Sequence, residues 1–458
     1  MAAPLLCWYG DDFTGATDTL AVLTQAGLRA MLFMGVPSPA QRAAAAQALG
    51  GPLDAVGIAG ISRSLVPAAM DAELAPVGSF FEASGSAILH YKVCSTFDSA
   101  PGIGSIGAAV GILRRSVRNP FVAIVGGQPN LGRYCVFSNL FAAAGQGGAV
   151  ERIDRHPTMR DHPTTPMREA DLRRHLALQG LRPVAALHCP VYGESAPAQQ
   201  GVLQGLLDEK PAAVLLDLAE TAQLAAVGRL MWQQAQQSSL LAVGPSGVEQ
   251  ALIAHWKEIG QGPAGLCEES DRRGNSTRQG LGPAEGPVFV FAGSLSPVTA
   301  RQVRAARSFQ HVALDARELL DSASYAATAQ AEISQALLRG RHVLACTAPV
   351  KADAADTTQS AELAQATARF VTATVHGQAA RGAPLKRIGI AGGDTSSLAV
   401  KALGVWGLSY RNTLGAGVTV SATHSDDPAL DGIALMLKGG QMGDEDMFER
   451  LLGSAPVG

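Results

Sequence analysis

Short apolar runs that end in polar turns alternate with longer helix-forming segments along most of the chain. The run from Leu5 to Tyr9 comes first, and the helical segment after its turn reaches Ala26, where Gly27 ends it. Apolar runs of this length, bounded by glycine, proline or polar turns, are typical of buried strands. Further strands are expected at 29–34, 55–59, 87–93, 121–125, 184–188, 213–218, 239–243, 287–291, 312–314, 342–345, 387–390 and 433–436, and helices at 41–49, 106–115, 298–308, 325–338, 358–375 and 398–403.

This alternation predicts an α/β fold in which a mostly parallel sheet is flanked by helices. The chain has 458 residues, and chains longer than about 250–300 residues divide into domains. The composition changes at 258–286, which is rich in glycine, proline and charged residues and is the best linker candidate. We therefore expect two such domains, 1–257 and 287–458, with the active site in the cleft between them.

One long segment, 126–170, breaks the alternation. It is rich in glycine, proline, histidine and arginine, and it includes Gly132-Arg133-Tyr134. A long stretch without a regular pattern inside a compact domain is usually a functional loop or a disordered one. Both interpretations stay open for this segment.

The bulk composition narrows the class of protein. The net charge of -3 and the absence of a basic block argue against nucleic acid as a partner, and no apolar run approaches the ~18 residues of a membrane span. The N-terminus lacks the basic region and cleavage site of a signal peptide. The six cysteines contain no CxxC pair, so neither a zinc site nor a disulfide framework is indicated. These features are typical of a cytoplasmic protein.

Polar residues gather directly after the expected strands of the first half. Ligands of a doubly wound sheet bind outside the carboxyl ends of its strands, where these residues are expected to lie. Arginine and lysine suit a carboxylate, and aspartates accept from hydroxyls, so the cluster suits a small polyhydroxylated acid. The alternative is helix capping, which for Thr17 and Asp18 is equally well supported. The cluster comprises Asp11, Asp12, Thr14, Asp18, Ser62, Arg63, Lys92, Ser95, Thr96 and Asp98.

Three glycine turns follow apolar runs in the second half. In one of them, Gly392 and Gly393 let a ligand approach the backbone. Three N-cap candidates follow, namely Asp394, Thr395 and Ser396. A helix N-terminus with free N–H groups suits phosphate, and the alternative is an ordinary capped helix. The other two turns are Gly293-Ser294-Leu295-Ser296 and Lys438-Gly439-Gly440-Gln441-Met442-Gly443.

An acid-binding half and a phosphate-binding half together favour phosphoryl transfer. Neither GxxxxGK[ST] nor GxGxxG occurs, so the common nucleotide signatures are absent. Two rival classes remain open: a non-catalytic sensor of acid sugars or nucleotides, and a lyase or dehydrogenase acting on the same acids. The missing dinucleotide fingerprint counts against the dehydrogenase.

The opening Asp11-Asp12-Phe13-Thr14-Gly15-Ala16-Thr17-Asp18 resembles the signature of the four-carbon acid sugar kinases. That family was long classed as a domain of unknown function and includes threonate, erythronate and 3-oxo-tetronate kinases. The resemblance runs nearly the full length of the chain. It further rests on Ser62-Arg63-Ser64, Lys92-Val93-Cys94-Ser95-Thr96-Phe97-Asp98-Ser99 and His162-Pro163-Thr164-Thr165-Pro166-Met167 in the N-terminal part, and on Gly293-Ser294-Leu295-Ser296 with Thr299 and Gln302, Gly392-Gly393-Asp394-Thr395-Ser396, and Lys438-Gly439-Gly440 with Gly443 in the C-terminal part.

The resemblance implies ATP-dependent phosphorylation of the terminal hydroxyl of a four-carbon acid sugar, with Mg²⁺ bridging the nucleotide phosphates. The substrate would be threonate, erythronate, 3-oxo-tetronate or a branched relative. Asp12 is the expected catalytic carboxylate, with Asp18 and Asp98 as alternatives. Arg63 and Lys92 would hold the carboxylate of the substrate.

The remaining implied contacts divide between the two domains. A small-molecule acid sugar is the expected partner, and the resemblance leaves a homo-oligomer open. No ligand set for Mg²⁺ stands out, and Asp394 is the one candidate. The implied substrate-binding residues are Asp11, Arg63, Lys92, Ser95, Thr96, Asp98 and His162, and the implied nucleotide-binding residues are Ser294, Ser296, Gly392, Gly393, Asp394, Thr395, Gly439 and Gly440.

Overall fold

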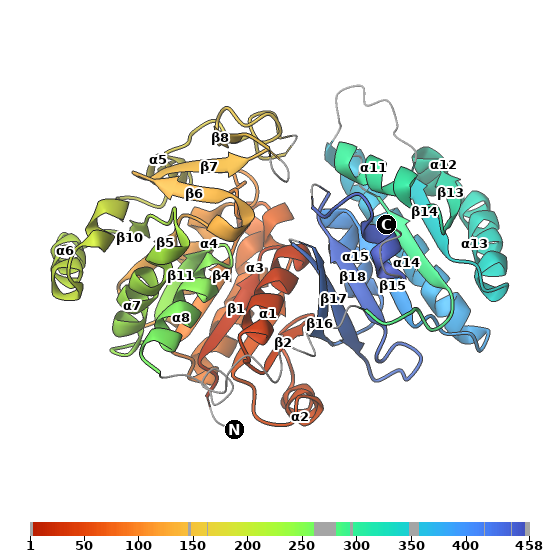
Figure 1. The fold of residues 1–458 in the computed structure, drawn as a ribbon, viewed down its shortest axis with the longest axis horizontal. Coiled ribbons are helices and arrows are strands. Elements are labelled where there is room, and N and C mark those ends of the chain that lie inside the picture. Colours follow the sequence, from red (N-terminus) through yellow and green to blue (C-terminus); the bar gives the residue numbers. More distant parts are fainter. Residues whose placement is uncertain are drawn as a thin grey trace. The chain divides into compact units, whose positions relative to one another are not determined.

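The computed structural model describes residues 3–144, 148–162, 164–260, 281–293, 296–347, 357–415, 417–440 and 442–453. The chain divides into two compact units, Met1–Asp271 and Arg272–Gly458. Most of the segment expected as a linker, 258–286, lies outside the described residues. Each unit contains a sheet flanked by helices, which confirms the expected α/β class (Figure 1).

The N-terminal unit is built on a parallel sheet with the strand order β2-β3-β1-β4-β11-β5-β10-β9. Strands β1, β3, β4 and β11 are buried along their whole length. Strands covered on both faces read as continuous apolar runs, which is why the sequence pattern located them. The strands are β1 (Leu6–Gly10), β2 (Ala30–Phe33), β3 (Ala55–Ala59), β4 (Ile88–Lys92), β5 (Val122–Val125), β9 (Val184–Leu187), β10 (Ala213–Leu216) and β11 (Leu240–Gly244).

Helices join these strands, and several of them begin at a side-chain cap. Ser38 and Gln41 form a capping box at the start of α2, and Asp12 caps α1. The α-helices are α1 (Phe13–Gln25), α2 (Pro39–Ala48), α3 (Pro67–Ser84), α4 (Ile106–Leu113), α5 (Leu172–Leu178), α6 (Ala196–Asp208), α7 (Leu224–Ala235) and α8 (Gly247–Glu258). The short 3₁₀ helices are η1 (Ser62–Ser64), η2 (Arg114–Ser116), η3 (Pro129–Leu131), η4 (Cys189–Gly193) and η5 (Thr221–Gln223).

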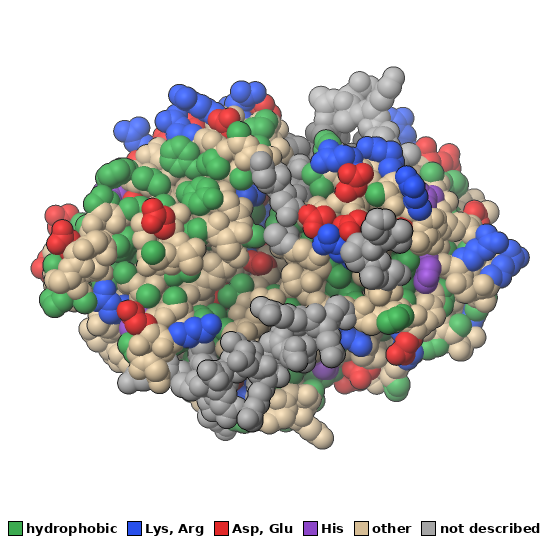
Figure 2. Space-filling model, viewed as in Figure 1, with side chains coloured by type: hydrophobic (Ala, Val, Ile, Leu, Met, Phe, Trp, Pro, Cys, Tyr) green, Lys and Arg blue, Asp and Glu red, His purple; other side chains and the backbone are tan. Residues whose placement is uncertain are grey.

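The segment that breaks the alternation contains a small antiparallel sheet. Its strands β6 (Arg133–Val136), β7 (Asn139–Ala143) and β8 (Val150–Arg152) pair in that order. The expectation of an irregular stretch was therefore wrong for these strands, because three- to five-residue strands that are only half buried lack a long apolar run. Figure 2 shows hydrophobic side chains over β6 and β7, with Lys and Arg side chains beside them.

A buried aspartate attaches this small sheet to the parallel sheet. Asp217, directly after β10, is fully buried and accepts from the backbone N–H groups of Phe137 (2.7 Å) and Ser138 (3.0 Å). These two residues form the β6–β7 turn with positive φ angles of 47° and 67°, the conformation that two-residue hairpin loops favour. His188 Nδ1 lies 3.1 Å from the same carboxylate. The side chain of Asp217 therefore fixes the turn that joins β6 to β7.

The C-terminal unit holds a second, mixed sheet with the strand order β13-β14-β12-β15-β18-β17-β16. The pairs from β13 to β18 are parallel, whereas β17 pairs antiparallel with both β18 and β16. The sequence pattern located the parallel strands and missed the β16–β17 hairpin. The strands are β12 (Val288–Ala292), β13 (Gln310–Leu314), β14 (Val343–Thr347), β15 (Arg387–Ala391), β16 (Gly407–Gly415), β17 (Val418–His424) and β18 (Ala434–Lys438).

Several helices of the C-terminal unit begin just after one of its parallel strands. Residues such as Val290, Met436 and Phe448 form the core between sheet and helices. No described helix of the chain is long and apolar enough to cross a membrane. The helices are α11 (Pro297–Ala305), α12 (Ala316–Asp321), α13 (Ala323–Leu338), α14 (Thr357–Ala380), α15 (Gly393–Ala402) and α16 (Met447–Leu451).

We predict that Asp217→Ala destabilises the protein. The change leaves the buried N–H groups of Phe137 and Ser138 without an acceptor, at a cost of roughly 2–5 kcal/mol for the pair. Urea unfolding measures the loss, and limited proteolysis between 133 and 152 shows where it acts. The matched control is Asp208→Ala, which removes an exposed aspartate at the end of α6. Equal unfolding midpoints for the two variants would contradict the anchoring role.

Candidate active site

Polar residues from the carboxyl ends of β1, β3 and β4 meet in the N-terminal unit, as expected. Arg63, on η1, donates through Nε and Nη2 to the two oxygens of Asp11 at 3.1 and 2.6 Å, and through Nη1 to Asp12 Oδ2 at 2.9 Å. A guanidinium has five N–H groups, so two remain for a ligand. Burial raises the pKa of Asp11 to about 6, although Arg63 acts to lower it.

Asp12 combines two structural tasks. Its Oδ1 accepts from the backbone N–H of Gly15 at 2.8 Å and so caps α1, while Oδ2 receives the Arg63 bond. A Cβ on Gly15 would lie 2.6 Å from Asp12 Oδ1 and 2.8 Å from Lys92 Nζ. Because glycine has none, the ammonium group of Lys92 reaches the neighbourhood of Asp12. Lys92 is buried and donates to the backbone oxygen of Val93 at 2.8 Å.

The loop after β4 supplies a second carboxylate. Thr96 Oγ1 donates to Asp98 Oδ1 at 2.6 Å. Burial would raise the pKa of Asp98, but Arg63 and the hydrogen bonds from Cys94 and Thr96 outweigh it and lower the pKa to about 2. Asp98 is therefore ionised at neutral pH and is a weak proton acceptor. Ser95 lies half-buried in the same loop.

Asp18 is held from two further strand ends. Its Oδ2 accepts from Ser246 Oγ at 2.6 Å and from Gln128 Nε2 at 3.3 Å. Among the described residues, none donates to its Oδ1. Sequence reasoning missed Ser246 and Gln128 as site residues, although each follows an apolar strand within three residues. Asp18 thus keeps one carboxylate oxygen open.

His162 belongs to the same neighbourhood. Its positive charge, when present, acts to lower the pKa of Asp98. The ring nitrogen Nδ1 accepts from the backbone N–H of Thr165 at 3.1 Å. A backbone N–H can only donate, so the neutral ring carries its proton on Nε2. His162 therefore offers an N–H donor from Nε2.

Three turns of the C-terminal unit are tied together by backbone and hydroxyl contacts. The N–H of Gly293 donates to Ala391 O at 2.8 Å, and the N–H of Gly392 donates to Lys438 O at 3.0 Å. Ser296 caps α11, and its hydroxyl bonds to the backbone oxygen of Gly440, as does the hydroxyl of Thr299 at 3.0 Å. These contacts bring the turns after β12, β15 and β18 to one edge, as the sequence predicts.

The start of α15 differs from the expectation. The helix begins at Gly393, and its N-cap is Gly392 with φ 132°. Asp394, Thr395 and Ser396 lie inside the first turn, so their prediction as N-caps was wrong. Glycine occupies the cap because residues with a side chain rarely adopt this φ. Ser294 and the side chains of Asp394 and Thr395 lie outside the described part of the chain, and Gly439 follows β18 directly.

Lys438 lies at the same edge of the sheet, and the sequence analysis gave it no role. It is fully buried at the end of β18, and Nζ donates to Thr299 Oγ1 at 2.9 Å. Burial lowers its pKa to about 7, and no ion pair of Lys438 occurs among the described residues. The sequence signal was a cation on the last residue of a buried strand, directly before two glycines.

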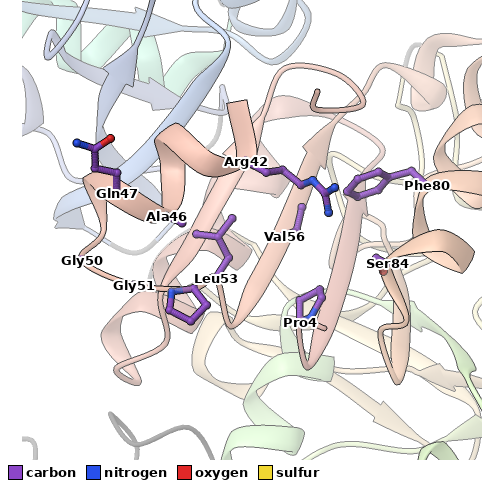
Figure 3. A pocket seen from close by; sticks show the side chains of 11 residues that line it. Pro4, Arg42, Ala46, Gln47, Gly50, Gly51, Leu53, Val56, Phe80 and Ser84 are labelled. Atoms are coloured by element: carbon purple, nitrogen blue, oxygen red, sulfur yellow. The ribbon is translucent and has the colours of Figure 1, made fainter. Parts of the chain in front are cut away.

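A cavity of about 400 Å³ lies elsewhere in the N-terminal unit. Figure 3 shows Arg42 and Phe80 beside it, together with Pro4 and Leu53, which precede β1 and β3. The cavity is therefore near the amino ends of these strands, whereas the polar cluster lies at their carboxyl ends. Within the described ranges, no group of three His, Cys, Asp or Glu side chains is arranged to hold a metal ion.

Comparison with known proteins assigns the chain to a family. Residues 6–252 match the model of a sugar-binding N-terminal domain, and residues 289–448 match that of a nucleotide-binding C-terminal domain. A sugar-binding domain followed by a nucleotide-binding domain defines a phosphotransferase of the sugar kinase class. The chain belongs to the four-carbon acid sugar kinase family, which confirms the resemblance seen in the sequence.

Curated relatives and solved structures match over nearly the whole chain. A 3-oxo-isoapionate kinase of Paraburkholderia graminis is 37% identical over 98% of this chain and 94% of its own. A 3-oxo-tetronate kinase of Methylobacterium radiotolerans is 31% identical over 96% and 97%. Two solved structures share the fold. One, from Salmonella typhimurium LT2, has a TM-score of 0.74 and 23% identity and covers 97% of this chain and 98% of its own. The other, from Haemophilus influenzae, has a TM-score of 0.67 and 24% identity and covers 98% of this chain and 99% of its own.

We predict that nucleotide affinity falls as the pH rises above 7, through Lys438. A lysine with a pKa of about 7 is neutral above that pH, and phosphate binds its protonated form, so affinity declines up to about tenfold per pH unit. Calorimetric titration of ADP from pH 6 to pH 9 measures the slope. Lys438→Met should flatten it, whereas the control Lys401→Met, at an exposed lysine of α15, should keep it. Identical slopes in both variants would refute the assignment.

Proposed function

We propose that this protein is an ATP-dependent kinase that phosphorylates the terminal hydroxyl of a four-carbon acid sugar. The observation that carries the proposal is the mixed cluster at the strand ends of the N-terminal unit, where carboxylates suited to hydroxyls stand beside Arg63 and Lys92. The names of the two relatives support kinase chemistry on 3-oxo acids. They disfavour a non-catalytic sensor. The product is the 4-phosphate of the acid.

The C-terminal unit binds the nucleotide phosphates in this proposal. The starts of α11 and α15 present backbone N–H groups, and such helix ends suit phosphate. Lys438 adds a cation whose burial makes its charge dependent on an anionic ligand. When bound, Mg²⁺ would supply charge neutralisation at the phosphates, and Asp394 is the residue proposed to hold it. The proposed phosphate contacts are Ser294, Ser296, Gly392, Gly393, Thr395, Gly439 and Gly440.

The N-terminal unit binds the acid. The hydroxyls of the acid meet carboxylates and hydroxyl side chains of this unit. Lys92 and the two remaining N–H groups of Arg63 donate to oxygens of the substrate. The proposed hydroxyl contacts are Asp11, Ser95, Thr96, Asp98 and the Nε2–H of His162.

Asp18 is the proposed carboxylate at the reacting hydroxyl. Phosphoryl transfer requires a positioned hydroxyl and commonly a carboxylate that accepts its proton. Asp18 has an open oxygen, whereas both oxygens of Asp12 already accept from protein donors. Asp98 is disfavoured by its low pKa. Asp12 remains the alternative.

An activity screen tests the function. Purified protein is incubated with ATP, Mg²⁺ and each of threonate, erythronate, 3-oxo-tetronate and branched relatives, including 3-oxo-isoapionate. We expect ADP formation that depends on one of these acids and a phosphate ester on its terminal carbon by ³¹P NMR. Binding of nucleotide and acid without turnover of any acid would instead support the sensor.

We predict that Asp18→Asn lowers kcat by about 10²–10⁴-fold, the usual contribution of a general base. Asparagine keeps an oxygen to accept from Ser246 and Gln128 but replaces the open oxygen with an amide NH₂, so the site keeps its shape. Steady-state kinetics and a thermal melt measure the two effects. Asp12→Asn is less clean, because its amide would face the donating Nη1 of Arg63.

The control for Asp18→Asn is Asp208→Asn, the same change at an exposed position of α6. It should leave kcat and KM unchanged. A kcat of Asp18→Asn within about threefold of wild type, far below the general-base range, would transfer the role to Asp12 or Asp98.

A further inference from the structure

Arg133, the first residue of β6, is a half-buried cation without a carboxylate partner among the described residues. Its Nη1 donates to the backbone oxygen of Leu131 at 2.6 Å, while its Nε is buried and makes no hydrogen bond. Burial lowers the pKa of this guanidinium, and no carboxylate acts to raise it. Nearby arginines differ, since Arg152 pairs with Asp154 and Arg173 with Asp171.

An unpaired cation in a low-dielectric environment is costly. The usual resolution is a protein carboxylate, which the neighbouring arginines have. Where the protein supplies none, an anionic ligand removes the cost on binding. Arg133 therefore has the electrostatics of a ligand-binding residue.

Backbone contacts place Arg133 beside the acid site. Its N–H donates to Gln128 O at 3.2 Å, and its carbonyl accepts from Gln128 N at 2.9 Å. The side chain of Gln128 donates to Asp18 at 3.3 Å. On another side, Cys94 of the loop after β4 is close enough to interact electrostatically with the guanidinium. Arg133 is therefore bonded through its backbone to a residue that holds Asp18, and its guanidinium lies near the loop that carries Asp98.

The guanidinium of Arg63, in contrast, is already neutralised by protein carboxylates. Arg63 pairs with both Asp11 and Asp12. Lys92 has no ion pair in the described part of the chain, but its ammonium group lies close to Asp12. A carboxylate that approached Arg63 would meet two protein carboxylates, whereas at Arg133 it would meet an uncompensated charge.

We propose that Arg133 binds the carboxylate of the acid substrate, while Arg63 holds Asp11 and Asp12 in place. This inference rests on the proposed function and names the specificity residue of its acid site. It also gives the small sheet a role, since the pairing of Arg133 with Ala142 of β7 fixes the backbone from which the guanidinium extends. An Arg–carboxylate contact selects acids over uncharged sugars.

Arg133→Met tests the proposal, because it keeps the unbranched apolar stem of the side chain and removes the charged guanidinium. The assay compares the accepted acid with its primary amide, which has the same shape and no charge. We expect the variant to raise the KM for the acid by about 30-fold or more and the KM for ATP by less than about threefold. Wild-type enzyme should favour acid over amide, and the variant should lose that preference.

Two controls separate binding from a structural role. Arg152→Met, on the same small sheet, removes an arginine with its own carboxylate partner and should leave the preference for the acid intact. Arg133→Lys restores the charge and should recover part of it. The melting temperature of Arg133→Met should not fall, because the change removes an unpaired cation. A lower melting temperature with an unchanged ratio of acid to amide would indicate a structural role and overturn the proposal.

The two proposals fail in distinguishable ways. If wild type phosphorylates the acid and Arg133→Met keeps its preference over the amide, this inference alone is wrong. If wild type phosphorylates none of the acids, calorimetric titration with the same acids replaces the kinetics. Binding that Arg133→Met abolishes would then support this inference without the kinase activity, and binding that survives the change, or no binding to wild type, would overturn it.

Discussion

The ion pairs of Arg63 with Asp11 and Asp12 organise the candidate acid site. They link the turns that follow the neighbouring strands β1 and β3, and they hold two carboxylates that would otherwise repel one another. Asp12 can then cap α1, and the glycine at position 15 leaves space for Lys92. The polar groups around Asp18 and Asp98 stand on this frame. The charge of Arg63 at the centre of the site is thus neutralised by protein carboxylates. Arg133, a cation without a carboxylate partner in the described part of the chain, lies at the margin of the site.

The C-terminal unit uses the same geometry with different chemistry. Its parallel strands end in turns that share backbone hydrogen bonds, so glycine N–H groups collect at one edge. Carboxylates hold the acid site, whereas a buried lysine and hydroxyl groups hold this edge. Both units therefore rely on parallel strands to bring distant turns together, and side-chain chemistry alone separates their roles.

Sequence patterns located the features that depend on neighbouring residues in the chain, such as buried strands. They missed the features that depend on which strands and side chains become neighbours in the fold. Buried parallel strands appear as apolar runs, so the positions of Asp11, Arg63 and Asp98 after them were predictable. That Arg63 would be neutralised by two aspartates was not, because it depends on which strand ends become neighbours. Arg133 lay in a segment whose strands are too short and too exposed to give a pattern. Lys438 was named at the start of a glycine turn but received no role, because its burial depends on packing that the sequence does not show.

The small sheet β6–β7–β8 also bears on how such proteins diverge. The parallel strands beneath it are buried on both faces, so most substitutions there reduce packing. Strands β6, β7 and β8 are half-exposed, and Asp217 holds their turn mainly through backbone N–H groups, which do not depend on side-chain identity. Substitutions on this sheet are therefore expected to cost little stability, so that a contact made from it can change without disturbing the parallel strands.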